Sequence, residues 1–161
     1  MTLEEWMAAF GGVYEHSPWV AERGYDAELV SPCCVKPALR KVVEAASRAE
    51  QDALINAHPD LAGRLALAGK LTTHSAREQA GAGLDQCSPR ELGKFHKYNT
   101  AYREKFGFPF IIAVKGLDRK AILKAFKKRL KNDPETERRT ALDEIHKIAG
   151  FRIDEWFASH D

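Results

Sequence analysis

Apolar side chains recur every three to four residues through most of this chain, and that spacing is typical of helices that bury one face. Each repeat begins at a recognisable helix start, for example the capping box Thr2–Glu5 or the Ser88-Pro89 pair. The helices that we expect cover residues 3–10, a short stretch from 18, 37–46, 47–57, a short stretch from 59 to 68, a stretch from 75, 89–106, 118–131 and 134–156.

Two stretches depart from this helical pattern. Residues 24–36 show no clear period and are predicted to be mostly loop. Residues 108–114 are apolar and β-branched but too short for a helix, so they are predicted to be extended. One isolated strand cannot form a sheet. The fold class that we expect is therefore all-α, a single-domain helical bundle over residues 1–161 with about eight helices and one short extended segment.

The hexapeptide 58–63 places a histidine between two predicted helices. Pro59 disfavours the α conformation for His58, because its ring crowds the preceding residue. Pro59 and Asp60 then suit the start of a short helix, which Leu61 and Leu65 would anchor. An imidazole at such a joint is held by the backbone and can face open space, which suits proton transfer. The alternative is that His58 only packs or caps a helix end.

The predicted extended segment poses a question about hydrogen bonding. Its main-chain groups have no sheet partners, and buried backbone groups need partners. Flanking loops could supply them. The alternative is a ligand that binds the main-chain groups of Phe110, Ile112 and Val114.

Two charged residues have a structural and a functional interpretation each. Glu78 follows Ser75 at the capping-box spacing, but in a pocket it would be a general base or hydrogen-bond acceptor. Arg152 lies one turn after Ile148 on a mostly apolar stripe. A buried guanidinium needs an anionic partner, which is either an internal carboxylate or the carboxylate of a substrate.

The remaining chemistry-bearing residues are weaker candidates. His74, His96 and His146 are predicted to be solvated, and the histidines lack metal-ligand spacing. Cys33 and Cys34 could hold zinc only with a further ligand, although no ligand-spaced pair supports this, and Cys87 is predicted to be inert.

Composition and charge restrict the functional class. The formal net charge is +2, which is too small to indicate nucleic-acid or membrane binding by itself. The odd number of cysteines, three, favours a reducing cytoplasm, and the acidic start of the chain does not resemble a signal peptide. No apolar run reaches transmembrane length.

One basic helix keeps a second class of function open. Within residues 118–131, we expect six of the cations on a solvated face or, as the alternative, on a nucleic-acid surface of a non-enzymatic module. The six are Lys120, Lys124, Lys127, Lys128, Arg129 and Lys131.

Several motifs in register resemble the family of 2-oxo-4-hydroxy-4-carboxy-5-ureidoimidazoline (OHCU) decarboxylases. They span nearly the whole chain, and only the stretch around Cys33 and Cys34 has no match. The motifs are Phe10-Gly11-Gly12-Val13, residues 15–22, residues 58–63, Ser75-x-x-Glu78-Gln79 with residues 80–84, Asn99-x-x-Tyr102, residues 106–111 and Arg152.

The resemblance implies an all-helical homodimer without a metal or organic cofactor. The implied reaction is the last step from urate to (S)-allantoin, in which an anionic ureidoimidazoline substrate loses CO2 and a ring carbon is protonated on one face. The resemblance assigns the catalytic roles to His58, the proton donor, Glu78 and Arg152. It assigns substrate binding to Pro59, Ser75, Gln79, Phe110, Ile111, Ile112, Ala113 and Val114.

Overall fold

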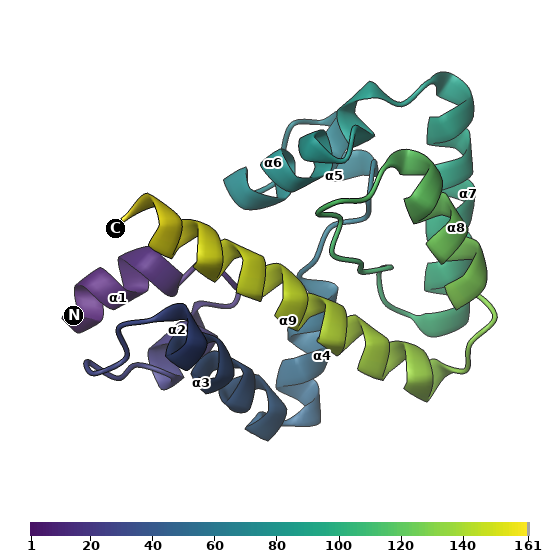
Figure 1. Ribbon diagram of the computed structural model, residues 1–161. Helices are drawn as coiled ribbons and strands as arrows, with labels where there is room; N and C mark the ends of the chain where they lie inside the picture. Colours follow the sequence, from purple (N-terminus) through teal and green to yellow (C-terminus); the bar gives the residue numbers. More distant parts are fainter. Residues whose placement is uncertain (161) are drawn as a thin grey trace. The chain divides into compact units, whose positions relative to one another are not determined.

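The all-α prediction is confirmed by a computed structural model, which describes residues 1–160 and all their side chains except that of Leu65. The regular structure of this part is helical and contains no strand (Figure 1). The elements are α1 (Leu3–Phe10), α2 (Pro18–Arg23), α3 (Pro32–Ala45), α4 (Arg48–Asn56), α5 (Arg64–Leu67), α6 (Thr73–Gly81), the 3-10 turn η1 (Leu84–Gln86), α7 (Pro89–Phe106), α8 (Arg119–Arg129) and α9 (Pro134–Ser159).

The chain divides into two compact units. The first contains residues 1–58 and the part of α9 from Ile145 onward, and the second contains Pro59–Glu144. The chain passes from one unit to the other at the His58–Pro59 peptide bond and returns at Glu144–Ile145 within α9. The expectation of one domain over residues 1–161 stays a prediction.

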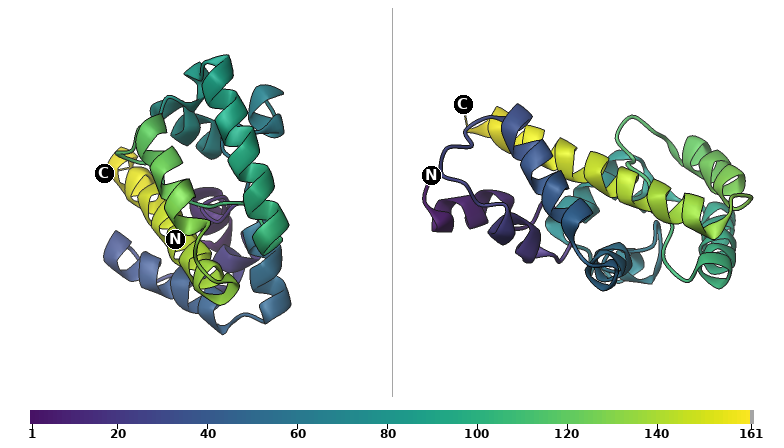
Figure 2. Two further views of the ribbon diagram at one scale, coloured as in Figure 1. Left: turned by 90° about the vertical axis from the view of Figure 1, so that its right-hand side faces the viewer. Right: turned by 90° about the horizontal axis from the view of Figure 1, so that it is seen from below.

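Aromatic side chains form the core of the first unit. Trp6 and Phe10 on α1 are buried, and their rings meet edge to face with centroids 4.8 Å apart. The indole N–H of Trp6 donates to the carbonyl of Ala21, 2.8 Å away, which joins α1 to its neighbour α2 (Figure 2). Phe10 also packs against Trp156 of α9. Burial of such large rings contributes strongly to stability, because each removes a large apolar area from water.

The core of the second unit is built on α7 and α8. Phe95 and Tyr102 of α7 and Phe126 of α8 are completely buried. The segment that joins the two helices inserts Phe110 into this core, where its ring stacks on that of Phe126 at 3.7 Å between centroids. This segment is irregular in Figure 1, as expected for residues that were predicted to lie outside helices.

The predicted capping box Thr2–Glu5 is confirmed, and boxes also form at Ser47 and Ser88, whereas the predicted box in α6 is wrong. Thr2, Ser47 and Ser88 each accept the backbone N–H three residues on, with the reciprocal glutamate bond in place. The predicted box from Ser75 to Glu78 does not form, because α6 begins earlier. The hydroxyl of Thr72 caps it by accepting from the Ser75 N–H, which leaves Glu78 inside the helix.

Two other predicted helix starts are wrong. The stretch predicted as loop ends in the first turns of α3, where Pro32 occupies an N-terminal position that proline favours, and Pro37 lies inside the helix. The short helix after His58 begins at Arg64 rather than at Pro59. The predicted anchor Leu65 lies outside the described side chains, whereas Leu61 is buried as expected.

Side chains stabilise the non-helical stretch before α5. The amide of Gln79 accepts from the N–H of Ala62 at 3.0 Å, and Asn99 donates to the carbonyl of Leu61 at 3.0 Å. Ala62 has a positive φ of 47°. Such a conformation is uncommon for alanine and persists only where the surroundings fix it.

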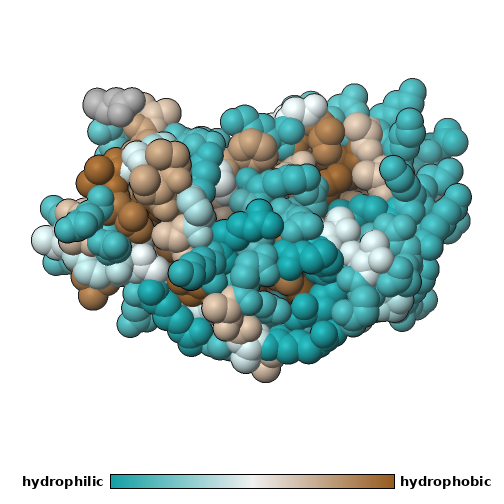
Figure 3. All heavy atoms as spheres, turned by 60° about the horizontal axis from the view of Figure 1, so that its bottom comes forward, coloured by the Kyte–Doolittle hydropathy of each residue, from teal (hydrophilic) through white to brown (hydrophobic). Residues whose placement is uncertain are grey.

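No described helix is long and apolar enough to cross a membrane. On the face shown in Figure 3, hydrophilic side chains surround separate patches of apolar ones. The large apolar side chains that are exposed are those of Leu3, Val30 and Leu67.

The capping geometry leads to a stability prediction. Ser88→Ala should lower the free energy of unfolding by about 1 kcal/mol, because the Glu91 N–H at the start of α7 loses the hydroxyl that accepts it. Ser31→Ala is the matched control, since Ser31 stands at the N-cap of α3 without a side-chain capping bond. Urea unfolding of both variants checks the difference, and equal losses would contradict the assigned role of the cap.

Candidate active site

The predicted histidine of the first unit is buried and oriented by the end of α4. His58 follows that helix and is 7% exposed, and its Nδ1 lies 3.0 Å from the carbonyl oxygen of Leu54. Because a carbonyl only accepts, Nδ1 carries the hydrogen, and the neutral ring presents a lone pair at Nε2. No described residue forms a hydrogen bond with Nε2. The imidazole is therefore held at one nitrogen and available at the other.

Burial sets the protonation state of His58. Loss of hydration lowers its pKa from 6.5 to about 4, although the Leu54 carbonyl and the Glu15 carboxylate favour the charged form. The positive charge of Arg152 acts in the same direction as burial. The ring is consequently neutral at pH 7, where it can accept a proton before it donates one.

Arg152 forms an internal ion pair in the first unit. Its Nη2 lies 2.9 Å from the Glu15 carboxylate, and both side chains are almost completely buried. A further N–H of Arg152 points at the carbonyl of Val13, 3.3 Å away. The structural interpretation of this arginine is thus confirmed, with Glu15 as the anion. A contact with a substrate carboxylate stays a prediction.

Three predicted residues of the second unit share one face of α6. Ser75, Glu78 and Gln79 are spaced by three and four residues, which places them together on a helix. Ser75 and Gln79 are buried, and Glu78 is half-buried. The Gln79 oxygen is already bonded to the N–H of Ala62, so this side chain also fixes the stretch that follows Pro59.

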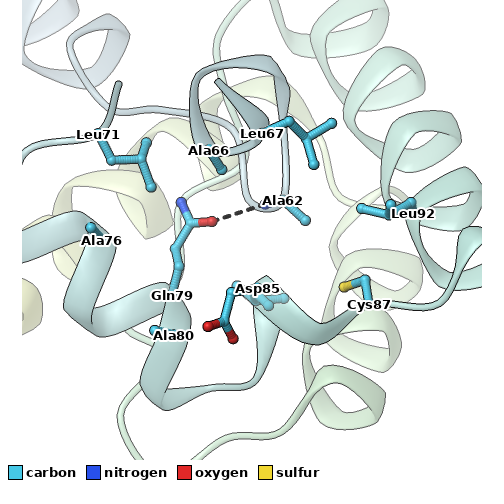
Figure 4. Close-up of a pocket in the computed structure, with 11 residues that line it drawn as sticks. Ala62, Ala66, Leu67, Leu71, Ala76, Gln79, Ala80, Asp85, Cys87 and Leu92 are labelled. Carbon is cyan, nitrogen blue, oxygen red and sulfur yellow. Dashed lines mark hydrogen bonds between the residues drawn. The ribbon is translucent and has the colours of Figure 1, made fainter. Parts of the chain in front are cut away.

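A cavity of about 450 Å³ lies beside Gln79. Figure 4 shows the residues that line it. Its walls are mostly apolar, and Asp85 and Cys87 are its other polar side chains. Ser75 and Glu78 are absent from its lining residues, which are Ala62, Ala66, Leu67, Leu71, Ala76, Gln79, Ala80, Leu84, Asp85, Cys87 and Leu92. Of the predicted site residues, Gln79 is the one among the lining residues of this cavity.

The segment from Phe110 to Val114 is buried except at Ala113, which is half-buried, and its main chain is only partly bonded. The Ile111 carbonyl accepts from Arg129 at 2.6 Å. The N–H and the carbonyl of Ile112 bond to no described residue, although the residue is only 9% exposed. Unpaired buried main-chain groups are rare in proteins and favour a ligand at this position. Val114 differs from the prediction, because its carbonyl accepts the N–H of Leu117.

The predicted site residues fall into two sets. His58 and Arg152 lie in the first unit with Glu15 as their common electrostatic neighbour. Pro59 and the residues of α6 and of the segment from Phe110 to Val114 belong to the second unit. Within each unit, the structure brings together residues that are far apart in the sequence.

Two charged residues near the predicted groups were not predicted as parts of a site. Glu15 occurs in a quoted motif, but its sequence context gives no sign of burial. Arg129 was expected on the solvated face of the basic helix, and that prediction is wrong because it is buried against Glu137. His146 was expected to be solvated and is instead buried, with hydrogen bonds to Tyr14 and Glu44.

The three thiols of the described part of the chain differ in their surroundings, and its side chains offer no metal site. It contains no group of three or more His, Cys, Asp or Glu side chains arranged to hold a metal ion. Cys33 and Cys34 are exposed, with their sulfurs 3.8 Å apart. Burial raises the pKa of the Cys87 thiol, which favours its unreactive form.

The pKa of His58 leads to a prediction for the ligand-free protein. NMR titration should give a pKa of about 4 for His58. The unfolded chain binds this proton near pH 6.5, so the stabilising effect of the neutral buried ring is complete above that pH and is lost as the pH falls to 4. Between pH 6.5 and pH 4, the free energy of unfolding of the unaltered protein should fall by about 3 kcal/mol more than that of His58→Asn. Identical pH profiles would contradict the assignment.

The buried ion pair of the first unit gives a second prediction. Glu15→Gln should lower the free energy of unfolding by about 3–5 kcal/mol, because the buried Arg152 charge loses the Glu15 carboxylate that faces it. The double variant Glu15→Gln/Arg152→Met should be more stable than Glu15→Gln alone, since it removes the unpaired charge. Denaturant unfolding measures both, and a double variant that is less stable would exclude this explanation.

Comparison with known proteins identifies relatives over nearly the whole chain. A family model described as OHCU decarboxylase matches residues 1–154. The protein is 44% identical over 157 residues to a 2-oxo-4-hydroxy-4-carboxy-5-ureidoimidazoline decarboxylase from Haloferax volcanii, with 97% of this chain and 91% of that protein covered.

Two solved structures have a similar fold. One is a crystal structure of (S)-allantoin synthase, with 30% sequence identity and a TM-score of 0.77 over 97% of this chain, which spans 51% of that longer chain. The other is an OHCU decarboxylase crystallised in the presence of (S)-allantoin, with 23% identity, a TM-score of 0.73 and coverage of 96% and 98%. The family model and the Haloferax relative show that the chain belongs to the OHCU decarboxylase family.

Proposed function

We propose that this protein decarboxylates OHCU to (S)-allantoin and CO2, the last step from urate to allantoin. The observation that carries the proposal is the family match over residues 1–154. The Haloferax relative with the same named activity is similar over almost its full length, which supports the same chemistry in this chain. The buried and partly unbonded imidazole of His58 is the group best suited to the proton transfers of this reaction.

The reaction needs a place for an electron pair and three movements of protons. When the C–C bond to the carboxylate breaks, CO2 leaves and its bonding electrons enter the neighbouring C=N bond of the ring, whose nitrogen takes up a proton. The product of this step is an enol, which loses its hydroxyl proton and gains a proton at the adjacent ring carbon. Protonation on one face alone makes the product chiral.

We assign the proton at the ring carbon to His58. The neutral ring first accepts a proton at Nε2, while Nδ1 stays bonded to Leu54. A substrate carboxylate beside the ring would raise its pKa from the low ligand-free value, since an opposite charge favours imidazolium. Glu78 accepts the hydroxyl proton in this assignment, and Pro59 shapes the wall beside the ring.

The other groups bind the substrate and stabilise charge. Main-chain N–H groups of the segment from Phe110 to Val114 can donate to the oxygen on which charge develops, and such donors are most effective where water is excluded. Arg152 contributes a cation that a substrate carboxylate or carbonyl can approach. Ser75 and Gln79 complete the polar face of α6. The assignment uses no metal or organic cofactor.

The partners and the compartment belong to the same proposal. We propose a small anionic substrate, a homodimer and a cytoplasmic location, with no nucleic-acid or membrane partner. The free thiols of Cys33, Cys34 and Cys87 support a reducing compartment. The nucleic-acid alternative for residues 118–131 is disfavoured by the family match, and one of its cations, Arg129, is buried.

The proposed function predicts a large effect of His58→Asn. The variant should keep the helical fold and lose about 10²–10⁴-fold of its activity, which is the usual contribution of general acid–base catalysis. The substrate is generated in place from urate with the two upstream enzymes, and circular dichroism follows the appearance of optically active allantoin. His96→Asn is the control, because His96 is exposed on α7.

Two outcomes of this assay would contradict the proposal. If the unaltered protein does not accelerate the formation of optically active allantoin, the assigned reaction is wrong. If His58→Asn forms (S)-allantoin at the parent rate, the reaction stands but His58 does not transfer the proton.

A further inference from the structure

The main chain of Ile112 lies between two bonded neighbours. The carbonyl of Ile111 accepts from Nη1 of Arg129 at 2.6 Å, and the N–H of Ala113 points at the Glu144 carboxylate, 3.4 Å away. The first contact is short and the second is at the long end of the hydrogen-bond range. The N–H and carbonyl of Ile112 itself bond to no described residue. Side chains of the protein thus form a hydrogen bond with one main-chain group on each side of Ile112.

Arg129 is unusually well anchored for a residue of a basic helix. Its Nε lies 3.0 Å from the carboxylate of Glu137, which is completely buried at the start of α9. The same carboxylate accepts from the hydroxyl of Tyr102 on α7 and from Asn132. The guanidinium also lies over the ring of Phe110, 4.4 Å from its centroid. Three helices therefore fix the position of one arginine.

A buried arginine and glutamate are an unfavourable way to fill a core if their role is only structural. Well-packed apolar residues often stabilise a core as much as a buried ion pair does, because the charges lose their hydration. What an apolar residue cannot supply is a donor at the carbonyl of Ile111. Arginine can satisfy Glu137 and Ile111 at the same time, since its planar group presents donors in several fixed directions.

We infer that Arg129 and Glu144 are positioning residues that hold the segment so that the N–H and carbonyl of Ile112 stay unpaired for the substrate. An adjacent donor and acceptor on one residue are complementary to an N–H and C=O pair on a ureido or lactam group. This inference rests on the proposed function for the identity of the ligand. The positioning itself concerns only residues of the second unit.

The substitution Arg129→Lys tests whether the geometry of the side chain matters, because it leaves the positive charge in place. Arg129→Lys keeps the positive charge beside Glu137, but one ammonium group cannot reproduce the fixed two-sided geometry. In the ligand-free protein, the NMR order parameter of the Ile112 N–H should fall from about 0.85 in the unaltered protein to below about 0.6. The matched control is Ile122→Val, a small loss of volume in the buried face of the same helix.

Kinetics provide the second measurement. Arg129→Lys should raise the KM for OHCU by about tenfold or more, because the unpaired groups of Ile112 no longer hold one position. Ile122→Val should keep the parent KM even if its Tm falls by as much as that of Arg129→Lys. A merely structural role of Arg129 would lower the amount of folded enzyme without changing KM.

A pair of variants at position 144 keeps the inference testable if Arg129→Lys fails to fold. Glu144→Gln retains an oxygen that accepts the N–H of Ala113 and should keep the parent KM, whereas Glu144→Ala should raise it about threefold to tenfold. Unchanged order parameters at Ile112 in Arg129→Lys and Glu144→Ala would overturn the inference, as would an unchanged KM in both. An unaltered protein without decarboxylase activity would instead refute the proposed function, and the order parameters would still decide the positioning.

Discussion

A charge buried among helices must be paired, and this constraint organises both units of the molecule. In the first unit, Glu15 neutralises Arg152 beside the imidazole of His58. In the second unit, Glu137 neutralises Arg129, which holds the carbonyl of Ile111. Neither pair is needed to form helices. Each fixes the position of groups that the proposed reaction uses, and each requires contacts between segments distant in sequence.

The properties of His58 follow from its place at the end of α4. The bond from Nδ1 to Leu54 selects one tautomer, and burial favours the neutral ring. A neutral imidazole with an available Nε2 is a base until it takes up a proton. The resulting imidazolium is then a strong acid in a site that disfavours its charge, which suits rapid delivery of the proton to carbon.

Local features of the fold could be predicted from the sequence because their causes are local. The cap at Ser88 and the exposed cap at Thr2 depend on residues three positions apart, and the stop of α7 at Gly107 needs only one glycine with positive φ. The start of α6 was misplaced because Thr72 and Ser75 offer equivalent hydroxyls. Nothing in the neighbouring sequence favours one of these two hydroxyls over the other as the N-cap of the helix.

The sequence indicated which residues could belong to the site, but not which distant residues they contact. His58, Glu78 and Arg152 were recognised from their types, their spacing and a family resemblance. The partner of Arg152 lies 137 residues away, and many acidic residues would have fitted equally well. Arg129 was placed on the wrong face because the helical period of α8 groups it with the neighbouring lysines. Its contact with the buried Glu137, which explains why it turns inward, cannot be read from that period.

The central claim of the proposed function is that His58 and Glu78 both serve the decarboxylation. A double-mutant cycle on kcat/KM with His58→Asn, Glu78→Gln and the combined variant tests it most directly. Residues that act together in one reaction are strongly non-additive. The account predicts that the combined variant is scarcely less active than the weaker single variant. Two losses that simply multiply would contradict it.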